Sequence, residues 1–382
     1  MLTPRTGLTR RTMAALDASP SRIPVLVGGC GSGRTTLLRQ LHDRIGRTST
    51  QYIDVERTAT TPERFLRAII GSSPFPAGDT APAGVRGAFD ATLAFFARAR
   101  AAGSAPATFL LDEFLELRTF ESFPGLRRVL HELIEGLAAS GNRLVLTSRY
   151  VARTMRLLRG RSARFEIIHM PPLTAEDTLD MLGLAAAPGD THEAGHLART
   201  VQALADGRPS YVCALADELA DMREHGGGDP ISALGSLLAP GGRLARECGF
   251  SYELRLHRAR GYGALKAILE IVADEEDLTL TEISQRLHRT PGSTKDYLSW
   301  LEDVDLVIGR SKRYSFIDPL LRVWVRLHCH ASPPTEEEVA REMHRYALPR
   351  IPPPHEPAMA MATAGGGPSE EDKKAWGIIE ID

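Results

Sequence analysis

Short apolar runs alternate, in the first half of the chain, with longer stretches in which apolar residues recur every three or four positions. The runs have the length of buried strands, and they are Pro24–Val27, Gln51–Val55, Thr108–Glu113, Arg143–Arg149 and Phe165–Met170. The longer stretches have the spacing of amphipathic helices, and they cover 35–41, 61–70, 85–101 and 126–139. Strands that alternate with helices predict an α/β fold, with a parallel sheet and helices on both faces.

The second half of the chain lacks this alternation and is mostly helical. Three stretches predict helices, and they are 174–184, 192–205 and 209–222. The Pro-, Ala- and Gly-rich segments 71–84 and 225–242 predict loops. Further on, helices are expected at 262–273, 281–287 and 294–304, and short strands at 306–308 and 314–316. Because the two strands flank a basic tip, Gly309–Arg313, we interpret this part as a winged helix.

The segment between the first strand and the first helix has the residues of a phosphate-binding loop. It follows the pattern G-x-x-x-x-G-K-[ST] at every fixed position except the lysine, which is Arg34. Glycines let successive backbone N–H groups point at phosphates, and the helix N-terminus adds partial positive charge. We therefore expect a nucleoside triphosphate, ATP, to contact Gly28, Gly29, Cys30, Gly31, Ser32, Gly33, Arg34, Thr35 and Thr36. Thr35 would place its hydroxyl on Mg²⁺.

Arg34 puts the hydrolysis of that nucleotide in doubt. Arginine keeps the positive charge of lysine but is longer, planar and forked, so the exchange is not conservative at such a site. No lysine precedes Lys266, which leaves no nearby substitute and also shows a general bias toward arginine. We expect nucleotide binding to survive and turnover to be slow.

The end of the third apolar run supplies acidic residues that suit the same site. Asp112 would hold Mg²⁺ through water, and Glu113 would orient the attacking water. A purely structural role for Asp112 is the alternative, since many buried strands end in an acid. Thr147 and Ser148, at the end of the next strand, lie where a residue sensing the γ-phosphate is expected.

The order of these motifs resembles that of the AAA+/STAND ATPases, and within them the archaeal-type ATPases related to origin-recognition initiators. The resemblance covers roughly residues 7 to 330, and it ends in the run Tyr-x-Phe-x-Asp-Pro-Leu-Leu-Arg-x-Trp at 314–324. It implies a nucleotide contact from Gly207, Arg208 and Pro209, which resemble the Gly-x-Pro motif of the lid; exposure of Arg208 is the alternative. It also implies an arginine finger for a neighbouring subunit of a homo-oligomer, for which Arg161 or Arg164 is the candidate; a solvated basic face is the alternative.

These observations divide the chain into five parts. We expect a P-loop ATPase core at 1–172, a helical lid at 173–228, a winged-helix domain with its lead-in at 229–332, a C-terminal helix at 333–350, and a disordered linker with an acidic and apolar tail at 351–382. The last residues, 369–382, alternate apolar and acidic side chains, which suits strand addition to a protein partner. The alternative is a tail that folds back on its own body.

The charged residues of the predicted winged helix do not decide whether it binds DNA or protein. Lys295, Arg310, Lys312 and Arg313 are the candidate contacts to duplex DNA, together with Arg286 and Arg289. The same helix carries Asp296, Glu302 and Asp303, and the net charge of the chain is −2. Dedicated duplex binders usually show a basic excess, and winged helices also dock proteins.

Composition narrows the setting of the protein. The 382 residues are 43% hydrophobic, yet no segment is apolar enough to span a membrane and no signal-peptide core is visible. The four cysteines have no C-x-x-C pairing, so neither a zinc site nor a disulfide framework is expected, and a reducing cytoplasm fits. Cys30 is a small loop residue or a thiol whose oxidation would block the nucleotide.

We therefore expect a cytoplasmic ATP-binding switch whose nucleotide state repositions its winged helix and tail. Two alternatives stay open: a DNA-associated ATPase of replication, transposition or defence, and a scaffold that keeps ATP as a structural ligand without hydrolysing it.

Overall fold

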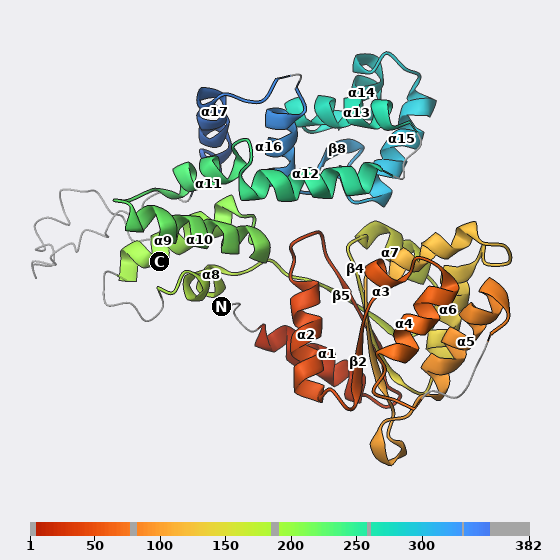
Figure 1. The fold of residues 1–382 in the computed structure, drawn as a ribbon. Helices are drawn as coiled ribbons and strands as arrows, with labels where there is room; N and C mark the ends of the chain where they lie inside the picture. Colours follow the sequence, from red (N-terminus) through yellow and green to blue (C-terminus); the bar gives the residue numbers. More distant parts are fainter. Residues whose placement is uncertain (1–4, 77–81, 185–190, 258–260, 331, 352–382) are drawn as a thin grey trace, which may run out of the picture. The chain divides into compact units, whose positions relative to one another are not determined.

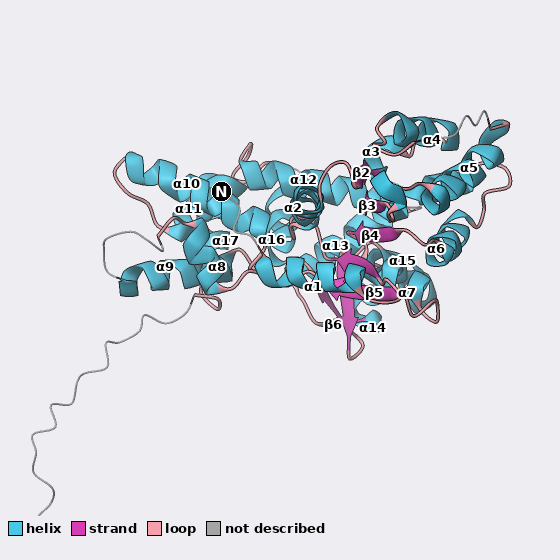
Figure 2. Ribbon diagram, turned by 90° about the horizontal axis from the view of Figure 1, so that it is seen from below, coloured by secondary structure: helices cyan, strands magenta, loops and turns pink. Residues whose placement is uncertain are grey.

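The computed structural model describes residues 5–76, 82–184, 191–257, 261–330 and 332–351. Five parallel strands form the central sheet in the order β2-β3-β4-β1-β5 (Figures 1 and 2). Their bounds are β1 Ile23–Val27, β2 Thr50–Asp54, β3 Thr108–Asp112, β4 Arg143–Ser148 and β5 Phe165–His169. All five coincide with the apolar runs of the sequence to within a residue or two, and the predicted α/β sheet is confirmed.

Helices cover both faces of this sheet, as Figure 1 shows. The helices of this part are α1 Thr6–Asp17, α2 Arg34–Ile45, α3 Val55–Thr58, α4 Pro62–Gly71, α5 Gly84–Arg98, α6 Val129–Ala139 and α7 Val151–Leu158, with the 3₁₀ segments η1 Ala102–Ser104 and η2 Phe114–Ser122. Successive strand residues point to opposite faces. Leu26 and Leu110 therefore pack with the leucines of α2, whereas Val25, Phe109 and Leu111 pack in the larger core with α4 to α6.

The lid begins as expected and then continues with a helix that the sequence did not predict. Helices α8 Ala175–Met181, α9 Thr191–Leu204 and α10 Pro209–Glu224 match the three predicted stretches. The segment 225–242, expected to be a loop, contains α11 Pro230–Leu238. That prediction was wrong because the Asp229 side chain caps the N–H groups of Ile231 and Ser232 and the apolar face is buried, which outweighs the loop-like composition of the flanks.

The C-terminal part carries a small antiparallel sheet among helices. Its elements are α12 Arg243–Leu256, α13 Tyr262–Asp274, β6 Leu278–Thr279, α14 Leu280–Arg286, α15 Pro291–Asp303, β7 Val307–Arg310, β8 Arg313–Phe316, α16 Pro319–His328 and α17 Glu336–Ala347. The strand order is β6-β8-β7. Three helices followed by a hairpin are the order expected of a winged helix. Ser311 and Lys312 both have positive φ, which makes a tight two-residue tip between β7 and β8.

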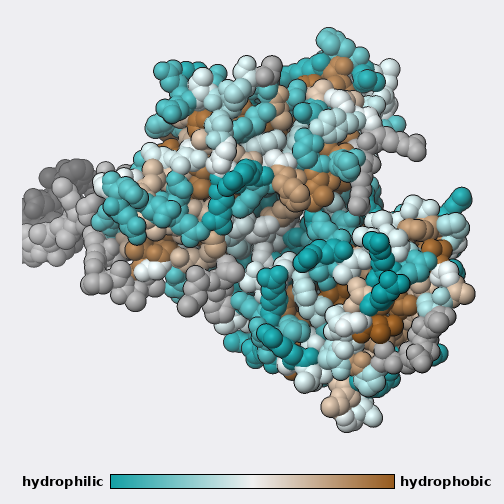
Figure 3. Space-filling model, viewed as in Figure 1, coloured by the Kyte–Doolittle hydropathy of each residue, from teal (hydrophilic) through white to brown (hydrophobic). Residues whose placement is uncertain are grey.

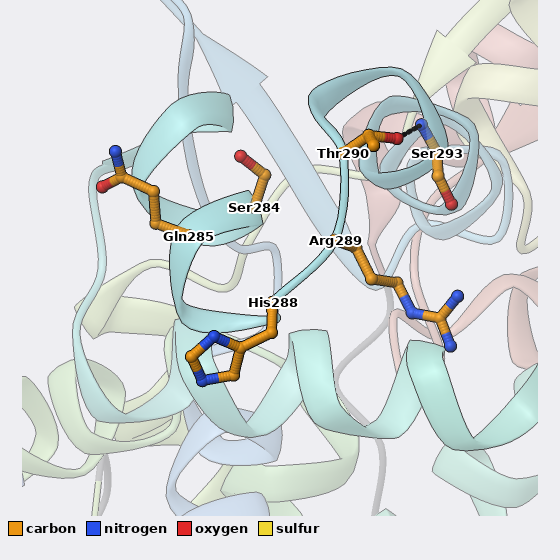
Figure 4. A pocket seen from close by; sticks show the side chains of 6 residues that line it. All are labelled: Ser284, Gln285, His288, Arg289, Thr290 and Ser293. Carbon is orange, nitrogen blue, oxygen red and sulfur yellow. Dashed lines mark hydrogen bonds between the residues drawn. The ribbon is translucent and has the colours of Figure 1, made fainter.

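The turn between α14 and α15 carries an open surface pocket. Figure 4 shows the six side chains that line it, with Thr290 capping the start of α15 by accepting the Ser293 N–H. Figure 3 shows a face that is largely hydrophilic, with apolar residues in small patches. No helix among the described residues is long and apolar enough to cross a membrane. The tail 352–382, to which we assigned disorder and a partner-binding peptide, lies outside the described residues.

Candidate functional site

The glycine-rich loop joins the carboxyl end of β1 to α2, at the centre of the sheet. Gly31 and Gly33 have φ of 75° and 86°, in the left-handed region that favours glycine. Gly33 is the N-cap of α2, and no side chain caps this helix. The first N–H groups of α2, which include those of Thr35 and Thr36, therefore lack a capping side chain and suit phosphate oxygens. This uncapped helix fits the expected nucleotide.

Arg34 folds back onto the loop instead of pointing into solvent. Its Nη1 donates to the carbonyl oxygens of Gly28 and Gly29 and, at 2.9 Å, to the Ser32 hydroxyl. Its Nη2 donates to Glu113 Oε1 at 2.7 Å. The residue is only 7% exposed. The guanidinium thus joins the loop to the carboxylate expected to act as the catalytic base, and the planar fork of arginine makes both contacts at once.

Asp112 and Thr35, the predicted magnesium ligands, are hydrogen-bonded to each other. The Thr35 hydroxyl donates to Asp112 Oδ2 at 2.7 Å, and the Tyr52 hydroxyl donates to the same oxygen at 2.8 Å. Thr147 donates to the other carboxylate oxygen, Oδ1. Burial, and next the charge of Asp112, raise the pKa of Tyr52. Hydroxyl and carboxylate oxygens fit Mg²⁺, which when bound would neutralise charge on phosphate oxygens.

Glu113 directly follows β3 in a left-handed conformation, with φ 57°. Both of its carboxylate oxygens are engaged, since Oε1 accepts from Arg34 and Oε2 accepts the Arg149 N–H at 2.9 Å. Its own N–H donates to the Thr147 hydroxyl. Burial alone would raise the pKa of Glu113, but the charges of Arg34 and Arg149 outweigh it and hold the pKa below its usual value. Glu113 is therefore ionised and held in place.

Arg149 belongs to this cluster, although the sequence analysis did not select it. It lies directly after β4, is buried, and pairs with both Glu113 and Glu56. Burial opposes its charge, but Glu113 and other anionic groups dominate and raise its pKa. In the sequence, the only indication that Arg149 belongs to the site is its position directly after the predicted sensor residues Thr147 and Ser148. Of that pair, Thr147 contacts both acidic residues, whereas Ser148 accepts the N–H of Tyr150.

The lid residues Arg208 and Pro209 lie against the loop, and the nucleotide contact that the resemblance implies for Gly207, Arg208 and Pro209 stays a prediction. A Cβ on Gly31 would stand 2.0 Å from the Ser210 hydroxyl, and one on Gly29 would stand 3.2 Å from Arg208 Nη1. The Arg208 side chain is 13% exposed and pairs with Asp318 at 2.8 Å, so the alternative of an exposed residue does not hold. A hollow of about 230 Å³ remains between loop and lid. Ligand pockets commonly measure about 300–1,000 Å³, so a nucleotide needs some opening here.

The candidate finger arginines are bonded within their own chain. Arg161 contacts Glu135 and His131, and Arg164 donates to the carbonyls of Ala138 and Ser140. Those carbonyls lie at the C-terminal end of α6, where a positive charge is stabilising. The structure holds one chain, so the finger stays a prediction.

The candidate DNA contacts are exposed, and two of the basic residues near them have partners within the chain. Lys295, Arg310, Lys312 and Arg313 are all exposed. The Arg313 side chain donates to the Asp277 carbonyl. The N–H of Gly309, the residue before Arg310, donates to the Glu302 carboxylate. Arg286, the last residue of α14, forms an ion pair with Glu275. DNA contact by these residues stays a prediction.

The sheet order and the loop between β1 and α2 are those of the P-loop NTPase fold, and an acidic pair lies at the end of β3. No protein-family model and no curated protein matches the sequence. Among solved structures, a Walker-type ATPase of Pyrococcus abyssi is similar over 85% of this chain and 95% of its own, with 17% identity and a TM-score of 0.62. The Orc1 protein of Aeropyrum pernix, solved with DNA, covers 90% and 93% at 18% identity and a TM-score of 0.45. At identities this low the similarity to the Pyrococcus abyssi structure shows a shared fold and says nothing further about what the chain binds.

Proposed function

We propose that this protein is an ATP-binding molecular switch whose resting state is closed by Arg34 and whose hydrolysis of ATP is consequently slow. The observation that carries the proposal is the double contact of Arg34, which holds the loop carbonyls and Glu113 at the same time. In this arrangement each Glu113 oxygen accepts a hydrogen bond from an arginine residue, so a water must compete with Arg34 for Oε1. Arg34 must leave Glu113 before it can meet phosphate oxygens.

The structure also suggests how the nucleotide state would reach the C-terminal part. Arg208 lies beside Gly29 of the loop and pairs with Asp318, the N-cap of α16. Asp305, in the turn after α15, accepts the N–H groups of Val151 and Ala152 at the start of α7. Helix α7 begins two residues beyond Arg149, which holds Glu113. Movement at either side of the nucleotide site is therefore expected to disturb a contact with the C-terminal helices.

The same double contact favours one alternative, a scaffold that retains ATP without hydrolysing it. In both readings Arg34 and the loop bind the phosphates; they differ in whether Glu113 becomes free to orient water. The described structure contains no observation that favours the DNA-associated ATPase over these two, so DNA is kept as one arm of the test.

The test is ATP binding and single-turnover hydrolysis by the purified full chain, with and without duplex DNA. Hydrolysis that is slow in the wild type and lost in Glu113→Gln supports the attenuated switch. Tight retention of ATP with no Glu113-dependent hydrolysis selects the scaffold. Stimulation by DNA selects the DNA-associated ATPase, and failure to bind ATP at all refutes the proposal.

A further inference from the structure

Cys30 has a neighbour that no part of the proposed nucleotide chemistry requires. It is the third residue of the loop, half-buried, and its sulfur accepts a hydrogen bond from Arg255 Nη2 at 3.2 Å. Arg255 belongs to α12, more than two hundred positions further along the chain. Ser251, one helical turn earlier on α12, lies near enough to lower the pKa of Cys30. One face of α12 thus presents a hydroxyl and a guanidinium to a single thiol.

Arg255 is a buried cation without a carboxylate partner. It is 3% exposed, its Nε has no hydrogen-bond partner, and its Nη1 donates to the backbone carbonyl of Asp305. The two nearest acidic groups are committed elsewhere, Asp305 to the start of α7 and Asp318 to Arg208. Within the described residues Arg255 forms no salt bridge. Because an unpaired buried charge is costly, the guanidinium favours an anion at the one polar side chain that it contacts, the Cys30 sulfur.

We propose that Cys30 is a redox-sensitive thiol, activated by Arg255 and oxidised by peroxides to a sulfenic acid. The attacking group is the Cys30 thiolate. A sulfur–oxygen bond forms as the peroxide O–O bond breaks; sulfur loses two electrons, and the released hydroxide takes up a proton to become water when hydrogen peroxide is the oxidant. The added oxygen gives Arg255 a further acceptor. Because Cys30 is only partly exposed, the class of reagent that this site would take is a small neutral oxidant.

Electrostatics supports this reactivity. Burial alone would raise the pKa of Cys30, but the charge of Arg255, the Ser251 hydroxyl and the charge of Arg149 outweigh it and lower the pKa to about 7. Reactive cysteines are thiolates in such electropositive, partly exposed surroundings. The chain supplies its own controls, since Cys213 and Cys329 have similar exposure and burial raises the pKa of both.

The experiment is pulsed alkylation of the reduced full chain with iodoacetamide, from about pH 6 to about pH 9, with each cysteine quantified by peptide mass spectrometry. We expect Cys30 to react first, with a midpoint near pH 7. Arg255→Met keeps the length and packing of the side chain and removes the charge. A two-unit rise in pKa would lower the thiolate fraction at neutral pH ~50-fold and raise its intrinsic nucleophilicity ~8-fold, so the alkylation rate should fall ~6-fold.

A second arm traps the sulfenic acid with dimedone after a pulse of hydrogen peroxide. We expect labelling at Cys30 in the wild type, weaker labelling in Arg255→Met, and little at Cys213 or Cys329. Ser251→Ala, which leaves the buried charge in place, should have a smaller effect than Arg255→Met, and it replaces that variant if Arg255→Met does not fold. The proposal is overturned if Cys30 reacts no faster than the two control cysteines, or if its midpoint in the wild type lies near that of a free thiol. Neither readout requires nucleotide, so this result is independent of the proposed function.

Discussion

Replacing Arg34 with lysine tests whether the arginine attenuates hydrolysis. The Arg34 fork bonds the loop carbonyls with one nitrogen and Glu113 with another, 2.7 Å away. A lysine ammonium is a single point charge and does not span both. The substitution therefore keeps the positive charge at the phosphates and removes one charge-assisted hydrogen bond that Glu113 must break before it can orient water.

The size of the effect follows from that one hydrogen bond. A hydrogen bond to a charged group contributes about 1.5–3 kcal/mol to the state that contains it. If this contribution stabilises the resting state and is lost before the chemical step, its removal lowers the barrier by the same amount. Each 1.4 kcal/mol is a factor of about ten in rate, so Arg34→Lys should hydrolyse ATP about 10- to 100-fold faster than the wild type.

The assay is single-turnover hydrolysis at saturating enzyme, which reports the chemical step rather than product release. Arg44→Lys, an exposed substitution near the end of the same helix α2, is the matched control and should leave the rate unchanged. The double variant Arg34→Lys with Glu113→Gln should lose the gain. If Arg34→Lys binds ATP but hydrolyses it no faster than the wild type, the Arg34–Glu113 contact does not limit turnover and the reasoning is wrong.

Three further outcomes are expected. Gly31→Ala should lower the melting temperature and the ATP affinity more than Gly46→Ala does. Both glycines have positive φ, but only at Gly31 would an added Cβ collide with Ser210 of the lid. Equal effects of the two substitutions would argue against a lid that is closed over the loop. Burial raises the pKa of Asp305 to about 6, against the opposing effect of the α7 N–H groups, so the folded state binds this proton more readily than the unfolded state does. The free energy of unfolding should therefore fall by roughly 3 kcal/mol as pH rises from about 4 to about 6, and urea titrations of Asp305→Asn should lack that component. Glu113→Gln should retain ATP while losing hydrolysis, measured by filter binding beside single turnover, and unchanged hydrolysis would remove Glu113 from the chemistry.

Most of the fold was readable from the sequence because its strongest signals are local. The five strands are short apolar runs, and all five are in the sheet. The strand order was not predicted, since periodicity carries no information on which strands pair. Helix α11 was missed for a related reason. Its residues are few and its flanks are rich in glycine, and its apolar face is buried because helices distant in sequence, including α10, α12 and α17, pack against it.

The sequence predicts the site residues that belong to a motif with fixed spacing. It does not predict contacts between residues that are far apart in the sequence. The sequence placed Arg34, Asp112 and Glu113 in one site but gave no sign that Arg34 would bond Glu113. Arg149 was grouped with the neighbouring strand, and Arg255 was not selected, because nothing near it in sequence marks it as buried beside the loop. In an arginine-rich chain the residue type alone carries little information about function. Arg149 and Arg255 are distinguished by their burial, which only the structure shows.

The pairing of Glu113 with two arginines explains how a closed site can still open. Removing the partner of a buried carboxylate normally costs about 3–5 kcal/mol, because the charge is left uncompensated. Here Arg149 holds the second oxygen of Glu113 through its N–H and lies 3.3 Å away through its guanidinium. When Arg34 leaves Glu113, the carboxylate therefore remains ionised and oriented, and one of its oxygens becomes free. The exchange costs one hydrogen bond rather than an unpaired charge, so under the proposed function Arg34 is a reversible restraint on Glu113.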